Sequence, residues 1–306
     1  MRILVIGGGG QVGTRIIEQA KNQFAVYATY QARRPPLDES KSFHVDKTNR
    51  QAVLNLFEKL EPEVAIDTAA LHNVDYCETH RDEAWTVNVE GTRNVAEACK
   101  KYGSRMIFVS TDYVFDGVKG NYTEDDTTNP INHYGVTKLE AERTIAQTLS
   151  DYVIARPSVI YGYVPISQRQ SSSGKPLNFA MWLAQKLRNE EPLKIVTDQY
   201  GSPTLADSLA ETLLKLAQSD KTGVYHTAGG TRLNRYEFAV KIAKKLKFKA
   251  TLITPIMTSQ LKQAAMRPMD SSLSVEKIEI HLGLRMPTID EALEKFKRQS
   301  VRGETL

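Results

Sequence analysis

Tyr134 and Lys138 are the residues whose types and spacing point most directly to acid–base chemistry. They are four positions apart in a segment predicted to be helical, so their side chains share one face. A free tyrosine has a pKa of about 10, too high for easy proton exchange near neutral pH. A nearby ammonium favours the tyrosinate and lowers that pKa. We therefore expect Tyr134 to exchange a proton with a carbonyl or alcohol; an ordinary surface pair is the alternative.

A glycine-rich stretch at 7–13 lies directly between a predicted strand and a predicted helix. Glycine permits a tight turn and the close approach of the backbone to a pyrophosphate. Free N–H groups at the start of the helix then face the negative charge. The context predicts a dinucleotide site, and a loop chosen only for its turn geometry is the alternative. The residues expected to bind the cofactor are Gly7, Gly10, Gln11, Val12 and Gly13.

The segment expected to meet the adenosine ribose is basic. An NAD site usually carries Asp or Glu about 20 residues past the glycine loop, and residues 27–34 contain neither. Arg33 and Arg34 could hold a 2′-phosphate by charge and bidentate hydrogen bonds. We therefore expect NADP(H), with NAD(H) as the less favoured cofactor. Asp46 could meet the adenine amino group, or it could simply be an acid near a helix N-terminus.

Alternating strand and helix patterns must position these residues. Strands are predicted at 3–6, 25–30, 43–45, 64–69, 105–110 and 152–156, with helices at 11–21, up to 60, at 81–102 and at 134–149 between them. This alternation predicts an α/β fold, a Rossmann-type doubly wound parallel sheet with helices on both faces. Ser110, Thr111 and Asp112 would then lie at a carboxyl edge of the sheet, where α/β folds bind ligands.

The pattern loosens after Arg156 and predicts a smaller C-terminal α/β substrate domain. We expect a dinucleotide-binding domain at 1–160 and a substrate-binding region at 161–306, from which about 194–228 could return to the sheet. Helices are predicted at 178–189, from an N-cap at Thr204 to about 218, at 235–246 and at 287–297. The polar stretch 167–176 predicts a loop that could close over substrate, or an insertion without a role.

Composition narrows the classes of function. The 306 residues are 41% hydrophobic and 25% charged, as in soluble globular enzymes. The net charge of +4 is too small and too scattered to predict nucleic-acid binding. Cys77 and Cys99 form no CxxC pair, and no metal site is expected. No apolar run approaches the roughly 20 residues of a membrane span. We expect a cytoplasmic protein without a membrane or nucleic-acid partner.

The motifs together resemble the extended short-chain dehydrogenase/reductase family over nearly the whole chain. The glycine loop, DTAALHNVD at 67–75, NVEGTRNVAEAC at 88–99, STDYVFDG at 110–117 and YGVTK at 134–138 are similar to the family's motifs in the right order. The resemblance implies a catalytic triad of Thr111, Tyr134 and Lys138, a structural or proton-relay Asn88, and cofactor contacts at Ala69 and Ala70. Asp67 and Thr68 stand where the family more usually has Asn-Ala.

Within the family, the branch of dTDP-4-dehydrorhamnose reductases is most similar, because five C-terminal segments resemble it. The resemblance implies an NADP(H)-dependent reductase of a nucleotide-activated 4-keto sugar. In this reaction Tyr134 protonates the new alkoxide, Thr111 hydrogen-bonds the carbonyl oxygen, and Lys138 lowers the tyrosine pKa and holds the nicotinamide ribose. Substrate contacts are expected at Ser110, Thr111, Asn178 and Arg267. Whether the chain forms a homodimer is left open.

Two other functions compete with reduction. Dehydratases of this fold tend to read Thr-Asp-Glu where this chain reads Thr111-Asp112-Tyr113, so the missing second acid argues against a nucleotide-sugar dehydratase or epimerase. A non-catalytic NADP-binding subunit, similar to the methionine adenosyltransferase β subunit, is the other alternative, and the complete triad weakens it. Val159 stands in or near a place where bacterial reductases often have Trp. The exact sugar therefore stays open.

Overall fold

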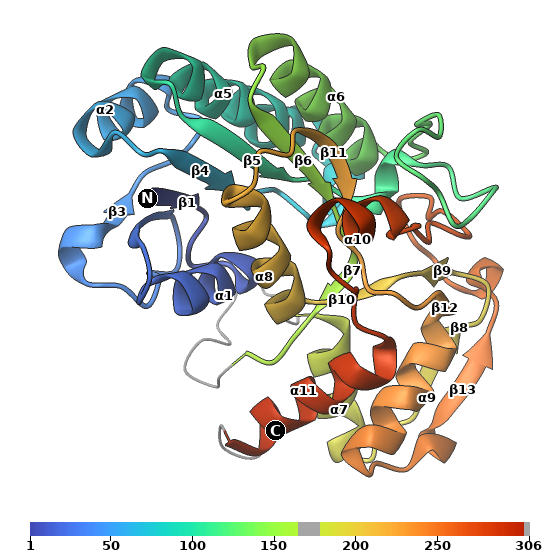
Figure 1. Ribbon diagram of the computed structural model, residues 1–306. Coiled ribbons are helices and arrows are strands. Elements are labelled where there is room, and N and C mark those ends of the chain that lie inside the picture. The colour runs from blue at the N-terminus through green and yellow to red at the C-terminus, as the bar shows by residue number, and fades with distance from the viewer. Residues whose placement is uncertain (165–177, 303–306) are drawn as a thin grey trace.

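The computed structural model describes residues 1–164 and 178–302, and a seven-stranded parallel sheet dominates it (Figure 1). The strand order is β11-β6-β5-β4-β1-β2-β3. Its strands are β1 (Arg2–Ile6), β2 (Ala25–Tyr30), β3 (Ser42–His44), β4 (Val64–Asp67), β5 (Arg105–Val109), β6 (Tyr152–Arg156) and β11 (Gly223–His226). The predicted doubly wound parallel sheet is confirmed.

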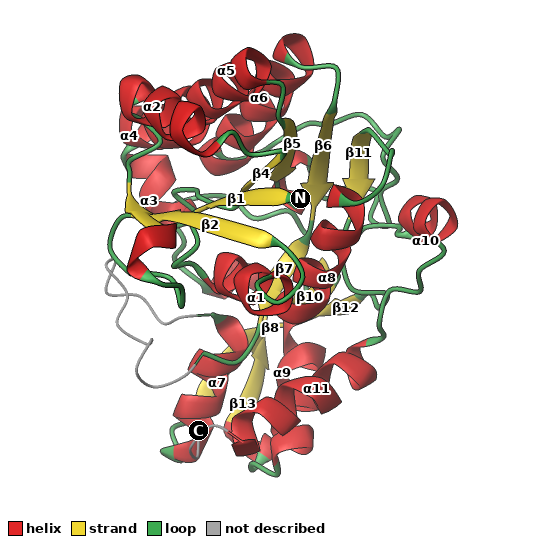
Figure 2. Cartoon of the chain, turned by 60° about the vertical axis from the view of Figure 1, so that its left-hand side comes forward, coloured by secondary structure: helices red, strands yellow, loops and turns green. Residues whose placement is uncertain are grey.

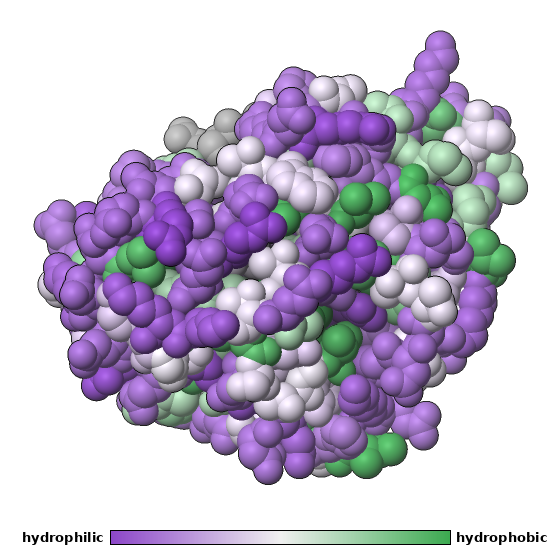
Figure 3. Space-filling view, turned by 90° about the horizontal axis from the view of Figure 1, so that it is seen from above, coloured by the Kyte–Doolittle hydropathy of each residue, from purple (hydrophilic) through white to green (hydrophobic). Residues whose placement is uncertain are grey.

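Helices cover both faces of this sheet because its strands are apolar on both sides. In β1, Ile3 and Val5 belong to the hydrophobic cluster formed with α1 (Gln11–Ala20) and α8 (Ala206–Ala217). Leu4 and Ile6 belong to the opposite cluster, with α2 (Arg50–Leu60), α5 (Gly91–Tyr102) and α6 (His133–Thr148). Seen from above, the surface on the side of α2, α5 and α6 is largely hydrophilic (Figure 3), as expected for helices that bury only one face.

A smaller unit lies below the sheet in Figure 2 and has its own hydrophobic cluster. Its centre is the parallel pair β8 (Leu193–Val196) and β13 (Ile253–Ile256), packed with the helices α7 (Phe179–Arg188), α9 (Arg235–Leu246) and α11 (Ile289–Arg302). Two further pairs connect the units: β7 (Ser158–Tyr161) with β10 (Pro203–Leu205), and β9 (Tyr200–Gly201) with β12 (Leu233–Asn234).

The segment 194–228 divides between the two units. α8 and β11 return to the large sheet, where β11 pairs with β6, whereas β8 stays in the smaller unit. The predicted N-cap at Thr204 is wrong. Thr204 lies in β10 and its hydroxyl donates to the Ser158 carbonyl at 2.6 Å, so the helix begins two residues later. The split into functional regions near residue 160 stays a prediction.

Short elements account for the remaining differences from the predicted pattern. The expected helix 81–102 is α4 (Arg81–Trp85), a π turn at Thr86–Glu90 and then α5. Two described helices were not predicted, α3 (Val74–Thr79) and α10 (Glu276–Leu282). Within residues 1–164 and 178–302, 3-10 turns lie at Glu39–Lys41, Asp112–Val114, Ala250–Leu252 and Thr258–Gln260. The predicted closing loop at 167–176 lies outside the described residues. None of the described helices is both long and apolar enough to cross a membrane.

Candidate active site

The glycine loop between β1 and α1 leaves no room for side chains. Gly7 has a φ of +83°, and a Cβ on it would lie 3.0 Å from the Ala69 nitrogen. A Cβ on Gly13 would lie 2.5 Å from the Gly7 oxygen. Gly10 is the N-cap residue of α1 and supplies no side-chain cap, so the N–H groups of the first turn remain available to an anion. The loop therefore has the shape and polarity of a diphosphate cradle.

A buried orphan donor beside this cradle supports the fit of a dinucleotide. Gln11 is the first residue of α1, and its Nε2 is buried without a hydrogen-bond partner. Its Oε1 accepts from Asn178 Nδ2 at 3.3 Å, so the side chain is fixed and its amide donor is left over. A buried amide group without a partner is costly, and a ligand oxygen would satisfy it.

The two arginines expected at a 2′-phosphate lie in different surroundings. Arg33 is partly buried, and its Nε donates to the Gly9 carbonyl at 2.5 Å, which places it against the glycine loop. Arg34 is exposed and pairs with Glu39 at 3.3 Å. Asp46 is exposed, and its carboxylate accepts from the Thr48 N–H at 2.8 Å, as in a local turn. Its contact with adenine stays a prediction.

Tyr134 is delivered to the end of β5 by the first turn of α6. Asn132 caps this helix by accepting from the Gly135 N–H at 2.9 Å. Gly135 is required there, since a Cβ would lie 2.2 Å from the Tyr113 oxygen. The Tyr134 ring meets the edge of the Tyr113 ring at 6.2 Å between centroids. Burial raises the pKa of Tyr134, and the neighbouring Thr111 side chain opposes that rise. Thr111 and Tyr134 are therefore adjacent, as the triad requires.

Lys138 lies one turn further along α6 and is almost fully buried, at 1% exposure. Its ammonium donates to the Val109 carbonyl at 2.7 Å and lies 3.8 Å from the centre of the Phe108 ring. Burial and then the nearby charge of Lys47 lower its pKa to about 7. The expectation that an ammonium lowers the pKa of Tyr134 is wrong for this structure, because burial of the phenol is the largest effect and raises it.

Asn88 joins the segment after β4 to the catalytic helix. Its Oδ1 accepts from the Leu71 N–H at 2.8 Å, and its Nδ2 donates to the Leu71 carbonyl at 3.1 Å and to the Thr137 hydroxyl at 3.0 Å. It lies in the π turn and is buried. This pattern favours the structural role over the proton relay. The same segment carries Ala69 and Ala70, with Ala69 directly against Gly7.

The expected substrate residues differ in what their side chains do. The Ser110 hydroxyl donates to buried Glu142, so a structural bond occupies it. Asn178 caps α7 and donates to the Gly162 carbonyl at 2.9 Å, which places it beside Gln11 at the glycine loop. Arg267 pairs with Asp75 at 2.9 Å and its charge acts on Tyr113. Their contacts with a substrate stay predictions.

Comparison with known proteins identifies the family. The model of the RmlD substrate binding domain matches residues 1–301. The chain belongs to this family. A dTDP-4-dehydrorhamnose reductase from Aggregatibacter actinomycetemcomitans is 31% identical over 310 residues, covering 97% of this chain and 98% of that one. The resemblance inferred from the motifs is confirmed.

Two further comparisons bear on cofactor and role. The crystal structure of dTDP-4-dehydrorhamnose reductase from Bacillus anthracis str. Ames in complex with NADP has a TM-score of 0.86 and 30% identity, covering 97% of this chain and 99% of that one. Methionine adenosyltransferase 2 subunit beta from Bos taurus is 28% identical, covering 94% of this chain and 84% of that one. Both an enzyme and a subunit thus share the RmlD architecture.

Two residues of this RmlD-family site were missed by the sequence reasoning. Arg235 begins α9, lies 5.5 Å from the centre of the Phe179 ring and hydrogen-bonds the Tyr113 side chain. Burial raises the pKa of Tyr113, whereas the Arg235 charge lowers it. Tyr113 could have been found from its place in the motif beginning at Ser110. Nothing in the local sequence marks Arg235, because its role depends on a contact across more than a hundred residues.

Asp112, next to Thr111, is buried and accepts hydrogen bonds from Ser158 at 2.8 Å and Ser271 at 2.5 Å. Burial raises its pKa. The Thr111 hydroxyl also donates to it at 3.1 Å, so Asp112 helps to orient that hydroxyl. Among the residues that the structure describes, no group of three or more His, Cys, Asp or Glu side chains could hold a metal ion.

Val159, singled out for the missing tryptophan, has a φ of +44° in β7. This left-handed conformation is strained for a β-branched residue. Its Cγ2 lies against Gly201, where an added Cβ would approach it to 3.1 Å. The side chain packs on the hydrophobic cluster of the smaller unit. A wide aromatic ring at this position would need a different arrangement of β7 and β9.

Proposed function

We propose that this chain is an NADP(H)-dependent reductase of a nucleotide-activated 4-keto sugar. The observation that carries the proposal is the adjacency of the Thr111 and Tyr134 side chains, with Lys138 one helical turn from Tyr134, at the same sheet edge as the glycine cradle. A phenol and a hydroxyl at a dinucleotide site are the groups that carbonyl reduction needs. Family membership and the reductases among the relatives support the same chemistry.

Each member of the triad has a distinct task in this proposal. Bound NADPH would supply a hydride to the keto carbon. Tyr134 donates its hydroxyl proton to the carbonyl oxygen, and its raised pKa keeps that proton in place at neutral pH. Thr111 hydrogen-bonds the same oxygen and orients it toward the phenol. Lys138, fixed by the Val109 carbonyl, lies where its ammonium would hold the nicotinamide ribose.

Charge at the other end of the site suits a nucleotide diphosphate. The guanidinium groups of Arg235 and Arg267 both act on Tyr113, whose ring lies 6.2 Å from that of Tyr134 between centroids. Guanidinium groups bind phosphate oxygens with charge-assisted, often bidentate hydrogen bonds. We infer that the diphosphate lies near these two arginines, with the sugar reaching toward Tyr134.

The competing functions have less support. Tyr113 occupies the position of the second dehydratase acid, and a phenol bound by Arg235 cannot replace a carboxylate in water elimination. The relationship to a methionine adenosyltransferase subunit keeps the binding-subunit alternative relevant. An intact set of buried Thr111, half-buried Tyr134 and buried Lys138 favours catalysis, since a pure binding role does not require an acid. Homodimer assembly and a cytoplasmic location stay predictions.

The deciding experiment is NADPH oxidation, followed by absorbance, with a panel of 4-keto nucleotide sugars that includes dTDP-4-dehydrorhamnose. We expect consumption of NADPH with at least one sugar and none with the matched Tyr134→Phe variant. Binding of NADPH by the variant, measured by fluorescence, shows that its site is intact. A wild-type protein that binds NADPH, reduces no sugar and co-purifies with an adenosyltransferase would overturn the proposal in favour of the subunit.

A further inference from the structure

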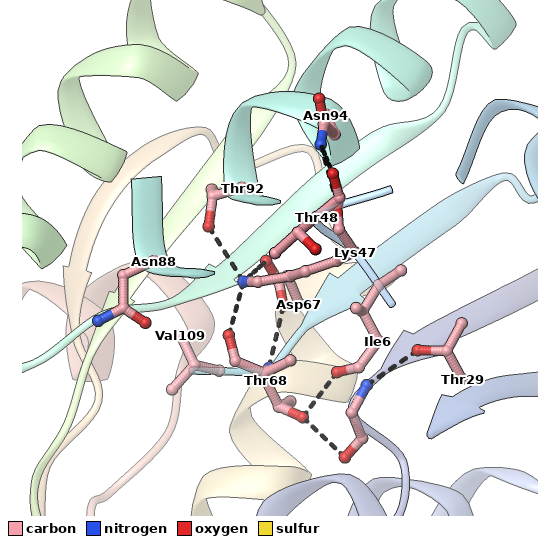
Figure 4. A network of polar contacts seen from close by, with 12 residues as sticks. Ile6, Thr29, Lys47, Thr48, Asp67, Thr68, Asn88, Thr92, Asn94 and Val109 are labelled. Carbon is pink, nitrogen blue, oxygen red and sulfur yellow. Dashed lines mark hydrogen bonds and ion pairs between the residues drawn. The ribbon is translucent and has the colours of Figure 1, made fainter. Parts of the chain in front are cut away.

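A buried lysine that the triad does not include lies beneath the cofactor segment. Lys47 lies between β3 and α2 and is 5% exposed. Its ammonium donates three hydrogen bonds, to Asp67 Oδ2 at 2.9 Å, the Ala69 carbonyl at 2.6 Å and the Thr92 hydroxyl at 3.1 Å (Figure 4). An ammonium has three N–H groups, so its donor capacity is fully used. Asp67 is itself 1% exposed.

The surroundings are built to hold this lysine in place. Asn94 donates to the backbone carbonyls of Lys47 at 3.0 Å and Thr48 at 3.1 Å (Figure 4). The aliphatic stem lies on Gly91, where an added Cβ would be 2.8 Å from Lys47 Cγ. Burying a charged pair costs several kcal/mol unless its geometry and hydrogen bonds are complete. A network this complete indicates that the position of the ammonium matters.

Lys47 and Asp67 hydrogen-bond the backbone of Ala69, the residue that lies against the glycine loop. The Lys47 ammonium donates to the Ala69 carbonyl at 2.6 Å, and the Ala69 N–H donates to Asp67 Oδ1 at 3.0 Å. Both backbone groups of Ala69 are thereby bound to one ion pair, and Ala69 lies directly against Gly7. Thr68, which lies between Asp67 and Ala69, donates from its hydroxyl to the Ile6 carbonyl at 2.9 Å. A shift of Lys47 or Asp67 would therefore move Ala69, which forms one wall of the glycine-loop cradle.

The pair also lies within electrostatic range of Lys138. The charged groups that act on Lys138 are Lys47 from the segment after β3, Asp67 from β4 and Glu142 from its own helix. Glu142 is paired with Arg156 of β6 at 2.6 Å, so its charge is largely balanced. The buried Cys99 thiol of α5 is a further titratable group that the Asp67 charge reaches. Besides burial, Lys47 lowers the pKa of Lys138 and Asp67 raises it.

We propose that Lys47 and Asp67 are a positioning pair of the reductase site, which fixes Ala69 against the glycine loop and balances the charge around Lys138. The proposal rests on the proposed function only where turnover is concerned. Asp67 stands where the motif of the wider family more usually has an uncharged asparagine, and in this chain the Lys47 ammonium meets its carboxylate at 2.9 Å. Lys47 and Asp67 touch no reacting atom; they act through Ala69 and Lys138.

The opposite charges of the pair give a test that a purely structural role cannot imitate. Lys47→Met removes the positive charge and leaves Asp67, so the pKa of Lys138 rises. Asp67→Asn removes the negative charge and leaves Lys47, so the pKa of Lys138 falls. The double variant, Lys47→Met with Asp67→Asn, removes both and should lie near the wild type. Each single shift is expected to be about one pH unit.

The measurement is a pH titration of Lys138 by NMR of isotope-labelled lysine in the protein without cofactor, assigned with Lys138→Arg. Fluorescence titration of NADPH across the same pH range gives the second readout, and we expect about tenfold weaker binding in each single variant because Ala69 is released. Thr92→Val is the matched control, since it removes one hydrogen bond of Lys47 without changing charge, and Lys138 should titrate as in the wild type.

Opposite shifts in the single variants, with recovery in the double variant, support the pair. Shifts in one direction, or no shift, overturn it. If a single variant fails to fold, the double variant still decides, because it lacks the Lys47 hydrogen bond to the Ala69 carbonyl: NADPH affinity within twofold of the wild type in the double variant would show that the pair does not position the cradle. Neither readout needs a sugar substrate, so a failed reductase assay leaves this test intact.

Discussion

The cofactor side and the substrate side of this site are built on different principles. The cofactor side consists of backbone groups at the ends of β1 and β4, held by glycines and by the Lys47–Asp67 network. The proposed substrate side consists of long side chains, chiefly Arg235 and Arg267, which act on Tyr113 from distant parts of the chain. The first suits a shape common to all dinucleotides, and the second would depend on a few charged side chains.

This difference explains why the two sides tolerate change differently. The glycine-loop cradle is made of backbone, so its shape changes only if the strands that carry it move. Side chains in the loop would force such a movement, and the loop must therefore keep its glycines. Side chains on α9 and on the segment before Ser271 can be exchanged without disturbing the sheet. New sugar specificity is therefore expected to arise on the substrate side while the cofactor side stays fixed. Tyr134 belongs to neither side alone, because it acts where they meet.

The largest effect is expected where the two sides meet. Tyr134→Phe keeps the ring and its contact with Tyr113 but removes the proton donor. General acid catalysis contributes on the order of 100- to 10,000-fold, so kcat should fall by that factor. NADPH affinity and the sugar KM should change little. Stopped-flow turnover and fluorescence titration measure these quantities, and unchanged turnover would remove Tyr134 from the mechanism.

The next effect is confined to the cofactor side. Gly13→Ala places a methyl group 2.5 Å from the Gly7 oxygen, which forces the loop or α1 to move. Overpacking of this kind costs about 1–3 kcal/mol, so NADPH should bind roughly 10- to 100-fold more weakly. Gly103→Ala is the matched control for glycine loss, because nothing lies within 4 Å of its Cβ; its φ of +68° affects stability only. A larger change in the sugar KM than in NADPH affinity would break the division between the two sides.

Much of the cofactor side could be predicted from the sequence, because its signals are local. The glycine loop, the β4 segment with Ala69 and the pair of Tyr134 with Lys138 each lie within a few residues on one element. Periodicity then places these elements at one edge of a parallel sheet. The family was likewise predictable, since its motifs follow each other in order along the chain.

The rest could not be predicted, because it depends on contacts between residues far apart in the chain. Arg267 meets Asp75 across 192 positions, and Asn178 meets Gln11 across 167. The rise in the Tyr134 pKa was missed for a related reason: the spacing to Lys138 suggested an ammonium effect, whereas burial by the surrounding fold is the larger one. The Lys47 network was missed because its three acceptors lie on two later elements.

A moderate effect is expected on the substrate side. Arg235→Ala and Arg267→Ala each remove a cation beside Tyr113, and a hydrogen bond to a charged group contributes about 1.5–3 kcal/mol. The KM for the nucleotide sugar should rise about tenfold or more, with NADPH affinity unchanged. Arg285→Ala is a matched control, because that exposed arginine pairs with Glu291 on the surface. Loss of NADPH binding in either variant would show that the two sides are not separate.

The smallest effect separates the two arginines near the glycine loop. Arg33 is anchored to the Gly9 carbonyl and partly buried, so its guanidinium is held in place for a 2′-phosphate. Arg34 is exposed and occupied by Glu39, and exposed pairs contribute about 0–1 kcal/mol. Arg33→Ala should therefore weaken NADPH about tenfold while leaving NADH affinity alone, which reduces the cofactor preference. Arg34→Ala should change NADPH affinity by about twofold or less.

Titrating both cofactors against both variants, at two salt concentrations, distinguishes a held guanidinium from a diffuse surface charge, because only the latter is strongly screened. Equal losses in the two variants would mean that the 2′-phosphate is recognised by general positive charge, and the cofactor side would then resemble the proposed substrate side in relying on charged side chains.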